Sequence, residues 1–335
     1  MTAIEAIATA LPASVLTNAQ LRAEQPDWDF DRLEQRTGVV ARHIAAKGET
    51  ALDLALNACW ELETRDELRA EKIDALIFCT QSPDYIMPPN SCLMHAKLGL
   101  RANVLALDIN LACSGYVYGL RLGASLIESG AANRVLLATA DTYSRYIHPR
   151  DRATRCLFGD GAAVSILAPS RDGRGIRDIR CGTSGRHHQQ FMIPAGGMRR
   201  PRSCETSRET VDQSGNVRTA EHIVMDGLGV LSFFNKTVPA SVREILAANH
   251  LTLRDVDVFV FHQASKVALD SIRTALEIPA EKMVIEFADT GNLVSASIPV
   301  ALKRALEKGS ARSGQLALLC GFGVGLSWGC AIVRL

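Results

Sequence analysis

The sequence predicts an α/β fold made by an internal duplication, in which strands alternate with helices in each half. Short apolar runs of strand length are separated by stretches with helical periodicity. The runs are apolar along their whole length, which is typical of strands covered by helices on both faces. The same order of segments then recurs in the second half of the chain.

The predicted elements are the apolar runs and helical patterns that lie between turn residues. In the first half we expect strands at residues 74–80, 104–110, 134–141 and 161–169, and helices at 49–63 and 114–129. In the second half we expect strands at residues 257–263, 283–289, 315–321 and 328–335, and helices at 264–277 and 294–308. The alternation of strands and helices predicts a largely parallel sheet.

The two halves match residue by residue over one strand. The segment IDALIFC (73–79) aligns with VDVFVFH (256–262), which places Cys79 opposite His262. Any two α/β units share some likeness of this kind. Here the helix length, the glycine that ends the helix and the Gly-rich turn that follows also agree in order. We therefore expect two like halves.

The duplication also relates Cys113 to Asn292. Cys113 lies 17 residues before Gly130, and Asn292 lies 17 residues before Gly309. In each half a helix is expected to begin close to this position. The two helix N-termini are therefore predicted to meet at one place.

The stretch 170–222 separates the halves and is polar, charged and rich in turn residues. We expect it to be a connector with surface excursions. The N-terminal half, 1–169, carries the candidate cysteine. The C-terminal half, 223–335, carries the candidate histidine and asparagine.

The composition describes a globular protein with a sizeable core, because 47% of the 335 residues are hydrophobic. The net charge of +1 gives no overall attraction to nucleic acid or anionic lipid. No apolar run approaches the ~20 residues of a membrane span, and the first residues lack the basic region of a secretory signal. We therefore expect a cytoplasmic protein. Its nine cysteines form no C-x-x-C pair, which predicts reduced thiols and no structural zinc site.

Cys113 is the first candidate for chemistry. A cysteine in an apolar segment is usually a small buried hydrophobic residue. In LACSG (111–115), however, it lies between a strand and a helix, among small residues that leave room for a substrate. A helix N-terminus offers free N–H groups and a partial positive charge of about half a unit, and both favour the nucleophilic thiolate.

His262 and Asn292 are the candidate partners. A lone histidine is usually structural, but His262 ends a predicted strand, at the edge where open α/β sheets bind ligands. Asn292 lies in a Gly-containing loop before a helix, where asparagine is most often an N-cap. Its equivalence to Cys113 gives a second reason for its place, since its amide would point where the nucleophile points. The turn CGFGVGLSWG (320–329) lacks the Gly-Lys-Ser/Thr of a phosphate loop and fits an oxyanion hole better.

At these residues the chain resembles the thiolase-like condensing enzymes, and most closely β-ketoacyl-acyl-carrier-protein synthase III. The resemblance spans nearly the whole chain and implies a thiolase-like five-layered αβαβα fold and a homodimer. Its markers, in order, are RTGVVARHIA (36–45), ETALDLA (49–55), LACSG (111–115), DRATRCLFGDGAA (151–163), IPAGGMRRP (193–201), MDG (225–227), HQAS (262–265), GNLVSASIP (291–299) and GFGVGLSWG (321–329).

The resemblance also implies the roles of the candidate residues. In this family a cysteine takes an acyl group from a thioester, and a decarboxylating malonyl thioester then attacks that group. Cys113 matches the nucleophile, and His262 and Asn292 match the pair that stabilises the enolate. The backbone N–H groups of Cys113 and Val324 match the oxyanion hole. No metal, flavin or nicotinamide is expected, and the substrates are thioesters of coenzyme A or phosphopantetheine.

Further residues are implied to bind the acyl donor. Arg36 and Arg152 match the phosphate and adenine side of the site, and Phe322 is also expected at the substrate. Met87, in the segment 84–100, is expected at or near the acyl pocket and to reach across the dimer; alternatively it is an ordinary interface methionine. Four basic residues form either a solvated face or a docking site for a carrier protein or its phosphopantetheine arm: Lys266, Arg199, Arg200 and Arg202.

Several residues depart from the family pattern. Ser265 replaces the Asn of HQAN, and Val324 replaces the middle glycine of the last turn. GNLVSAS (291–297) replaces GNTSAAS, which makes the wall near Asn292 bulkier and more apolar. Arg32 stands where members that use coenzyme A often carry a tryptophan. We therefore expect donor recognition that is weaker for coenzyme A or directed at a carrier protein.

The expected activity is formation of a 3-oxoacyl thioester by decarboxylative Claisen condensation, either in fatty-acid initiation or in specialised metabolism. The departures from the family pattern favour specialised metabolism. One alternative is an acyltransferase that passes the acyl group to an oxygen or nitrogen nucleophile. Another is a non-catalytic subunit of a heterodimeric synthase. Retention of both His262 and Asn292 argues against the first alternative, and the intact Cys–His–Asn set argues against the second. The sequence leaves open the acyl chain length and the carrier of the malonyl group.

Overall fold

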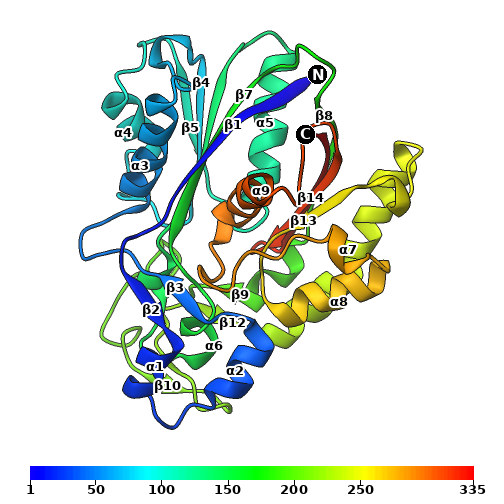
Figure 1. Ribbon diagram of the computed structural model, residues 1–335. Helices are drawn as coiled ribbons and strands as arrows, with labels where there is room; N and C mark the ends of the chain where they lie inside the picture. The colour runs from blue at the N-terminus through cyan, green and yellow to red at the C-terminus, as the bar shows by residue number, and fades with distance from the viewer.

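The structure is a computed structural model that describes the whole chain, residues 1–335. It has five layers in the order αβαβα, because two β-sheets enclose a central pair of helices and each sheet carries further helices on its outer face (Figure 1). The fold expected from the sequence, a thiolase-like five-layered duplication, is confirmed.

The nine main strands form one hydrogen-bonded sheet that divides between β1 and β8 into two parts, the first sheet and the second sheet. The first sheet has the strand order β5-β4-β6-β7-β1. β4 pairs in parallel with β5 and with β6, whereas β7 is antiparallel to both of its neighbours, β6 and β1. The sheet therefore mixes both directions. Its strands, in the order given, are Leu105–Ile109, Ala75–Cys79, Val135–Asp141, Gly161–Pro169 and Thr2–Ala10.

The second sheet has the strand order β13-β14-β15-β8. β13 is parallel to β14, and β15 is antiparallel to both β14 and β8. This pattern repeats that of β4-β6-β7-β1, so the duplication is present in the topology. The two sheets meet only at the pair Thr2–Ile176. The strands of the second sheet are Val258–Phe261, Leu316–Gly323, Ser327–Arg334 and Gly175–Thr183.

Helices α5 (Gly115–Glu128) and α9 (Ser297–Lys308) form the central layer and contact strands of both sheets (Figure 1). A stripe of glycines lets α5 approach the first sheet closely. A Cβ atom at Gly119 would lie 2.5 Å from the Leu137 side chain, and one at Gly123 would lie 2.5 Å from Leu167. Close packing in this layer fixes where the N-terminus of α5 lies.

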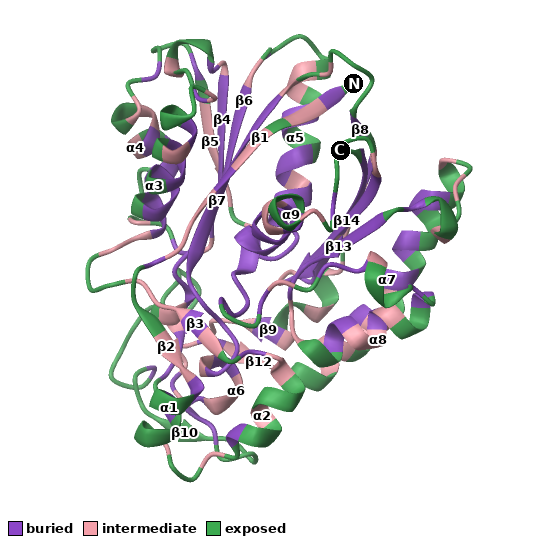
Figure 2. Ribbon diagram, viewed as in Figure 1, coloured by how far each residue is buried: buried purple, intermediate pink, exposed green.

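The outer helices are α3 (Ala51–Thr64) and α4 (Asn90–Lys97) on the first sheet, and α7 (Gly227–Ala248) and α8 (Lys266–Leu276) on the second. Three large hydrophobic cores result, one in the central layer and one beneath each outer pair of helices, and two much smaller clusters accompany them. Figure 2 shows the buried strands between helices whose outward faces are exposed. No helix of the structure has the length and apolar character needed to cross a membrane.

The remaining elements lie at the end of the molecule where α2 and β10 are drawn in Figure 1. They are β2 (Val15–Thr17), α1 (Asn18–Glu24), α2 (Phe30–Thr37), β3 (Ala41–His43), α6 (Arg152–Arg155), β9 (Phe191–Met192), β10 (Thr210–Val211), β11 (Val217–Arg218) and β12 (Val224–Met225).

The expectation of a largely parallel sheet is wrong. Only residues 324–326 join β14 to β15, which allows a hairpin but not the crossover that parallel strands require. The connection from β6 to β7 contains a single short helix, α6, and likewise returns antiparallel. A buried strand is a continuous apolar run whether it is parallel or antiparallel to its neighbours, so the sequence pattern could not distinguish the two directions.

The expected strand at 283–289 is also wrong, because this segment makes only one bridge, between Phe259 and Met283. Beyond that bridge, hydrogen bonds from the Gln263 side chain take the place of the backbone hydrogen bonds that a strand would make with β13. Gln263 Nε2 donates to the Val284 carbonyl at 3.3 Å, and its Oε1 accepts from the Glu286 N–H at 2.8 Å. The glutamine that follows His262 therefore holds this edge of the second sheet.

The stretch 170–222, expected to be a connector, contains a core strand. Residues 175–183 form β8, which pairs along its length with β15. The sequence GIRDIRCGT has neither a continuous apolar run nor strict alternation, because the register with β15 shifts between Ile176 and Asp178 and places Ile176 and Ile179 three residues apart. No simple strand pattern therefore marks β8. The rest of the stretch holds turns and short hairpins, as expected.

Candidate active site

Cys113 lies in the turn between β5 and α5, against strand β14. Its side chain is 3% exposed. A Cβ atom at Gly323 would lie 2.6 Å from the Cβ of Cys113 and 2.8 Å from its sulfur, and one at Gly321 would lie 2.7 Å from the Cys113 carbonyl oxygen. The two glycines of β14 are what allow the nucleophile turn to approach this strand.

A chain of hydroxyl groups ties this turn to the hairpin between β14 and β15. Ser114 Oγ lies 2.7 Å from Ser327 Oγ, and Ser327 Oγ donates to the Val324 carbonyl oxygen at 2.8 Å. The backbone N–H of Val324 has no acceptor in the chain, and that of Cys113 contacts only its own sulfur. The Val324 N–H is therefore free to donate, and the Cys113 N–H is engaged only by its own sulfur.

His262 follows the last residue of β13, and its own backbone N–H donates to the Cys320 carbonyl at 2.8 Å. Its ring packs edge-on against Phe322, with the ring centroids 5.4 Å apart. Nδ1 of the ring lies 2.6 Å from Ser297 Oγ. Burial lowers the pKa of His262 to about 3, so the imidazole is neutral at pH 7 and has one N–H to donate.

Asn292 is fixed by both its backbone and its side chain. Its N–H donates to the Leu157 carbonyl at 2.9 Å, which joins it to the first half of the chain. Its Oδ1 accepts the Val294 N–H at 2.9 Å, so the amide NH₂ must face the other way. Nδ2 lies 3.3 Å from His262 Nε2. Gly291, with a φ of +70°, makes this turn possible.

The structure brings the three sequence candidates together at β14. Cys113 contacts Gly323, and His262 contacts the preceding residue, Phe322. Asn292 joins the set through His262. Each of the three side chains is at most 3% exposed. Cys113 and His262 are therefore buried against adjacent residues of one strand, with Asn292 beside the imidazole.

Burial raises the pKa of the Cys113 thiol, and the nearby Asp141 carboxyl raises it further. The expectation that a helix N-terminus would favour the thiolate is therefore wrong for the substrate-free site. α5 begins only at Gly115, with Ser114 as its N-cap, and the sulfur contacts just its own N–H. Desolvation outweighs a partial charge of about half a unit. The resting group is a neutral thiol.

Asp141 is a buried carboxyl that the sequence analysis missed. It ends β6 and joins the two halves behind the site, because it accepts from the Gln81 N–H at 2.8 Å and from Ser295 Oγ at 2.5 Å. Burial raises its pKa to about 7. A charged residue at the end of an otherwise apolar strand was the available signal.

A cavity of about 320 Å³ begins beside the candidate oxyanion hole. Val324 and Gly325 line one side of it, and the opposite walls are mainly apolar and aromatic. Tyr143 and Gln81 both line this cavity, and the Tyr143 hydroxyl donates to the Gln81 side-chain oxygen. The lining residues are Gln81, Asn110, Tyr143, Tyr146, His188, Phe191, Met192, Ile193, Ile223, Val324 and Gly325.

The residues expected to bind the donor are placed as follows. Arg36 is exposed in the last turn of α2. The α2 cap residue Gly38 lies against Lys266, which forms an ion pair with Asp270. Phe322 is 3% exposed and serves as the wall behind His262. Of the three arginines named with Lys266 as a solvated face or a docking site, Arg199 is exposed, while Arg200 pairs with Glu205 and Arg202 with Glu221.

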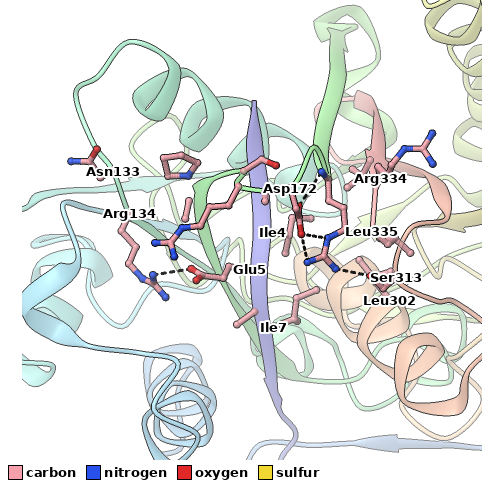
Figure 3. A pocket seen from close by; sticks show the side chains of 18 of the residues that line it. Ile4, Glu5, Ile7, Asn133, Arg134, Asp172, Leu302, Ser313, Arg334 and Leu335 are labelled. Carbon is pink, nitrogen blue, oxygen red and sulfur yellow. Dashed lines mark hydrogen bonds and ion pairs between the residues drawn. The ribbon is translucent and has the colours of Figure 1, made fainter.

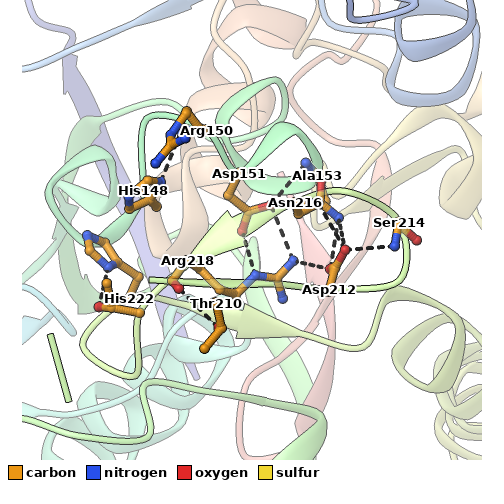
Figure 4. A network of polar contacts seen from close by, with 11 residues as sticks. His148, Arg150, Asp151, Ala153, Thr210, Asp212, Ser214, Asn216, Arg218 and His222 are labelled. Carbon is orange, nitrogen blue, oxygen red and sulfur yellow. Dashed lines mark hydrogen bonds and ion pairs between the residues drawn. The ribbon is translucent and has the colours of Figure 1, made fainter. Parts of the chain in front are cut away.

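Arg152 is the first residue of α6 and donates to the Ser214 carbonyl at 3.0 Å. The hairpin formed by β10 and β11 carries Ser214. Arg218 holds this hairpin against α6, because it pairs with both Asp151 and Asp212 (Figure 4). Arg152 is thus fixed in position by a polar network.

Met87 is 77% exposed and lies in the segment between β4 and α4. Its neighbours Tyr85 and Ile86 are 59% and 89% exposed. Three consecutive apolar side chains in water are unusual and indicate a contact surface.

A larger open groove of about 950 Å³ lies elsewhere, along β1 and the C-terminus (Figure 3). Ile4, Ile7 and Leu335 line it. It also includes Asp74, which directly precedes β4, so it lies at the amino ends of the parallel strands. Cys113 and His262 lie at the carboxyl ends, where ligands bind in such sheets. The groove is therefore separate from the candidate active site.

Comparison with known proteins agrees with this geometry. Family models described as 3-oxoacyl-[acyl-carrier-protein (ACP)] synthase III match residues 107–185, and models of its C-terminal part match residues 246–335. The chain is 37% identical over 329 residues to a β-ketoacyl-[acyl-carrier-protein] synthase III of Campylobacter curvus, covering 98% of this chain and 95% of the relative. It also resembles a crystal structure of a 3-oxoacyl-(acyl-carrier-protein) synthase III, with 42% identity, a TM-score of 0.97 and coverage of 100% and 99%.

A synthase III of the same kind from Thermus thermophilus has a TM-score of 0.87 and 32% identity, with 99% of both chains covered. These likenesses extend over the whole fold and include the segments that carry Cys113, His262 and Asn292. The chain belongs to the 3-oxoacyl-[acyl-carrier-protein] synthase III family.

Proposed function

We propose that this chain is a condensing enzyme that forms a 3-oxoacyl thioester from a Cys113-bound acyl group and a malonyl thioester. The observation that carries the proposal is the pair of side-chain donors, His262 and Asn292, held 3.3 Å apart, with His262 and the buried Cys113 against adjacent residues of β14. Membership of the synthase III family supports it.

In the first step the Cys113 sulfur attacks the carbonyl carbon of an acyl thioester. The N–H groups of Cys113 and Val324 receive the negative charge that develops on the carbonyl oxygen. The tetrahedral intermediate then expels the thiol of the carrier, which leaves with the proton that Cys113 gives up. An acyl-cysteine and a free carrier thiol result.

In the second step a malonyl thioester binds with its carbonyl oxygen at His262 and Asn292. The bond to the carboxylate breaks and CO₂ leaves, while its electron pair forms an enolate. The two N–H donors stabilise that charge, and removing one such donor typically lowers a rate ~10²–10³-fold. The enolate carbon attacks the carbonyl carbon of the acyl-cysteine, and the carbon–sulfur bond breaks. The 3-oxoacyl thioester is released, and the Cys113 thiolate takes up one proton from solvent to become a thiol again.

The neutral state of His262 suits this step. A protonated imidazole buried beside the thioester would be costly to form, and the lowered pKa of about 3 avoids it. The ring is then a hydrogen-bond donor to the enolate rather than a general acid. Its protonation state is the same over the whole physiological pH range.

The cavity beside Val324 is proposed to hold the acyl chain. A water occupies roughly 30 Å³ of liquid, so an acetyl group, with three heavy atoms, needs about 90 Å³. The cavity of about 320 Å³ has room for several more carbons. Its aromatic walls favour an apolar or aromatic acyl group, and we expect medium chains to be accepted as well as acetyl.

The donor thioester is proposed to enter past α2 and α6, where Arg36 and Arg152 lie. Lys266 adds a third positive group on the same side as Arg36. Basic residues of this kind suit the phosphates of coenzyme A or of a phosphopantetheine arm, or an acidic carrier protein. With Arg32 replacing an aromatic residue on α2, a carrier-protein donor is favoured over free coenzyme A.

A homodimer is proposed from the exposed apolar segment that contains Met87. The partner would cover Tyr85, Ile86 and Met87, and Met87 would approach the cavity of the other subunit. A cytoplasmic location and a reaction that needs no metal, flavin or nicotinamide remain predictions. Fractionation of cells tests the first, and activity of the purified protein after treatment with a chelator tests the second.

Intact-mass measurement tests the proposal. The protein is incubated with acyl-CoA and acyl-carrier-protein donors from acetyl to decanoyl, and the adduct is mapped to Cys113. A malonyl thioester is then added, and CO₂ and the 3-oxoacyl product are measured. Transfer of the acyl group to an alcohol or amine without CO₂ would support the acyltransferase alternative. No adduct with any donor would support a non-catalytic subunit.

A further inference from the structure

Ser297 is the first residue of α9, and its hydroxyl contacts the ring nitrogen of His262 that faces away from Asn292. Oγ lies 2.6 Å from Nδ1, which is a short hydrogen bond. The two side chains are each 2% exposed. No water is expected to replace either partner.

The Ser297 hydroxyl has one hydrogen-bond partner in the chain, His262 Nδ1. If Nδ1 carried the ring proton, it would donate to the serine, and the buried serine proton would be left without an acceptor. An unpaired buried donor costs about 1–3 kcal/mol. The serine therefore donates, Nδ1 accepts, and the ring proton is on Nε2.

Asn292 favours the opposite arrangement. Its amide NH₂ faces Nε2 at 3.3 Å, since its Oδ1 is occupied by the Val294 N–H. Without a substrate the amide would donate to a bare Nε2, which moves the ring proton to Nδ1. This contact is longer than the serine contact, so the serine prevails. The two neighbours of the ring thus compete for its tautomer.

We propose that Ser297 is a positioning residue that keeps the His262 ring proton on Nε2, so that the imidazole and the Asn292 amide both point N–H groups at the thioester oxygen. The kinetic part of this inference rests on the proposed condensation; the tautomer itself does not. Without the serine hydroxyl, Asn292 captures Nε2 and one of the two donors to the enolate is lost.

NMR of protein labelled with ¹⁵N-histidine reads the tautomer directly, because the protonated and bare ring nitrogens have well-separated shifts. The His262→Gln variant assigns the signal among the eight histidines. Wild type is expected to show Nε2–H, and Ser297→Ala is expected to move population to Nδ1–H. Ser297→Thr keeps the hydroxyl and restores Nε2–H. Ser295→Ala is the matched control, because that buried hydroxyl bonds Asp141 and not the imidazole.

Kinetics of the same variants separate this role from a structural one. Ser297→Ala is expected to acylate Cys113 within about threefold of wild type but to release CO₂ from the malonyl thioester ~10–100-fold more slowly. This decrease in the decarboxylation rate is smaller than the effect of removing an oxyanion donor altogether, because a fraction of the His262 rings still carries the proton on Nε2. Ser297→Thr is expected to recover most of the decarboxylation rate.

The proposal is overturned if wild type carries its proton on Nδ1, or if Ser297→Ala retains Nε2–H in a folded protein. An equal loss in acylation and decarboxylation would also overturn it, since that pattern indicates a general disturbance of the site. Failure of wild type to release CO₂ would refute the proposed condensation and leave the tautomer result standing.

Discussion

Replacing Gly323 by alanine tests whether Cys113 is held against β14. The new Cβ would lie 2.6 Å from the Cys113 Cβ and 2.8 Å from the sulfur, whereas ordinary contact begins at 3.4 Å. The cysteine side chain must therefore retreat by about 0.6–0.8 Å, the difference between these distances. Because a misplacement of about 1 Å can lower a rate about 10²-fold, we expect acylation of Cys113 to slow roughly 10- to 50-fold.

The same substitution also overpacks a buried contact, which typically costs about 1–3 kcal/mol of unfolding free energy. The backbone at Gly323 does not have a positive φ, so no conformational strain is added. The variant is therefore expected to fold and to be slow, rather than to be lost. Urea unfolding measures the first effect, and the time course of the acyl adduct by intact mass measures the second.

Gly185→Ala is the matched control, because a Cβ at that position meets nothing within 4 Å and its φ is not positive. It should leave the unfolding free energy within about 0.5 kcal/mol of wild type. Acylation of the Gly323→Ala variant at the wild-type rate, with unchanged stability, would refute the placement of the nucleophile turn on this strand.

Three further predictions follow from the site and the surface. His262→Ala and Asn292→Ala should each lower CO₂ release ~10²–10³-fold while Cys113 still takes up an acyl group, as judged by intact mass; equal loss of both steps would contradict their assigned place in the second step. Neutral buried His262, with its pKa lowered from 6.5 to about 3, contributes stability that is lost as the pH falls from 6.5, since the unfolded chain binds the proton first. His262→Gln should therefore gain about 2 kcal/mol relative to wild type between pH 6.5 and 5 in urea unfolding. Burial raises the pKa of the Asp141 carboxyl to about 7, so its titration changes stability in the opposite sense, but equally in wild type and variant. A difference in unfolding free energy between the two proteins that does not change with pH would disprove the neutral state assigned to His262. Met87→Asp should shift the sedimentation of the protein from dimer to monomer, because it adds a charge to the exposed apolar segment; a wild-type monomer would contradict the proposed interface.

The sequence revealed most strands of the two sheets because buried strands are continuous apolar runs. The pairing of Cys79 with His262 was readable for the same reason, since the duplication preserves the position of each strand. β4 ends at Cys79 and β13 ends at Phe261, so the two strand ends agree with that alignment to within one residue. Strand direction was not readable, because antiparallel β7 and β15 are as apolar as their parallel neighbours.

The principal members of the site were named from position at helix and strand ends, but their supporting contacts were not. Ser297 lies 35 residues from His262 in the chain, and Ser295 lies 154 residues from Asp141. Such contacts depend on how the halves pack, which local pattern does not encode. The ionisation of Cys113 was misjudged for the same reason, because desolvation is a property of the whole fold.

One measurement tests the central claim most directly. Protein carrying a mass-verified acyl group on Cys113 is mixed with a malonyl thioester labelled in its free carboxylate, and the labelled CO₂ is counted against the acyl-cysteine consumed. We predict one CO₂ and one 3-oxoacyl thioester for each acyl group that leaves Cys113. Loss of the acyl group as a free acid, ester or amide, with no labelled CO₂, would contradict the account.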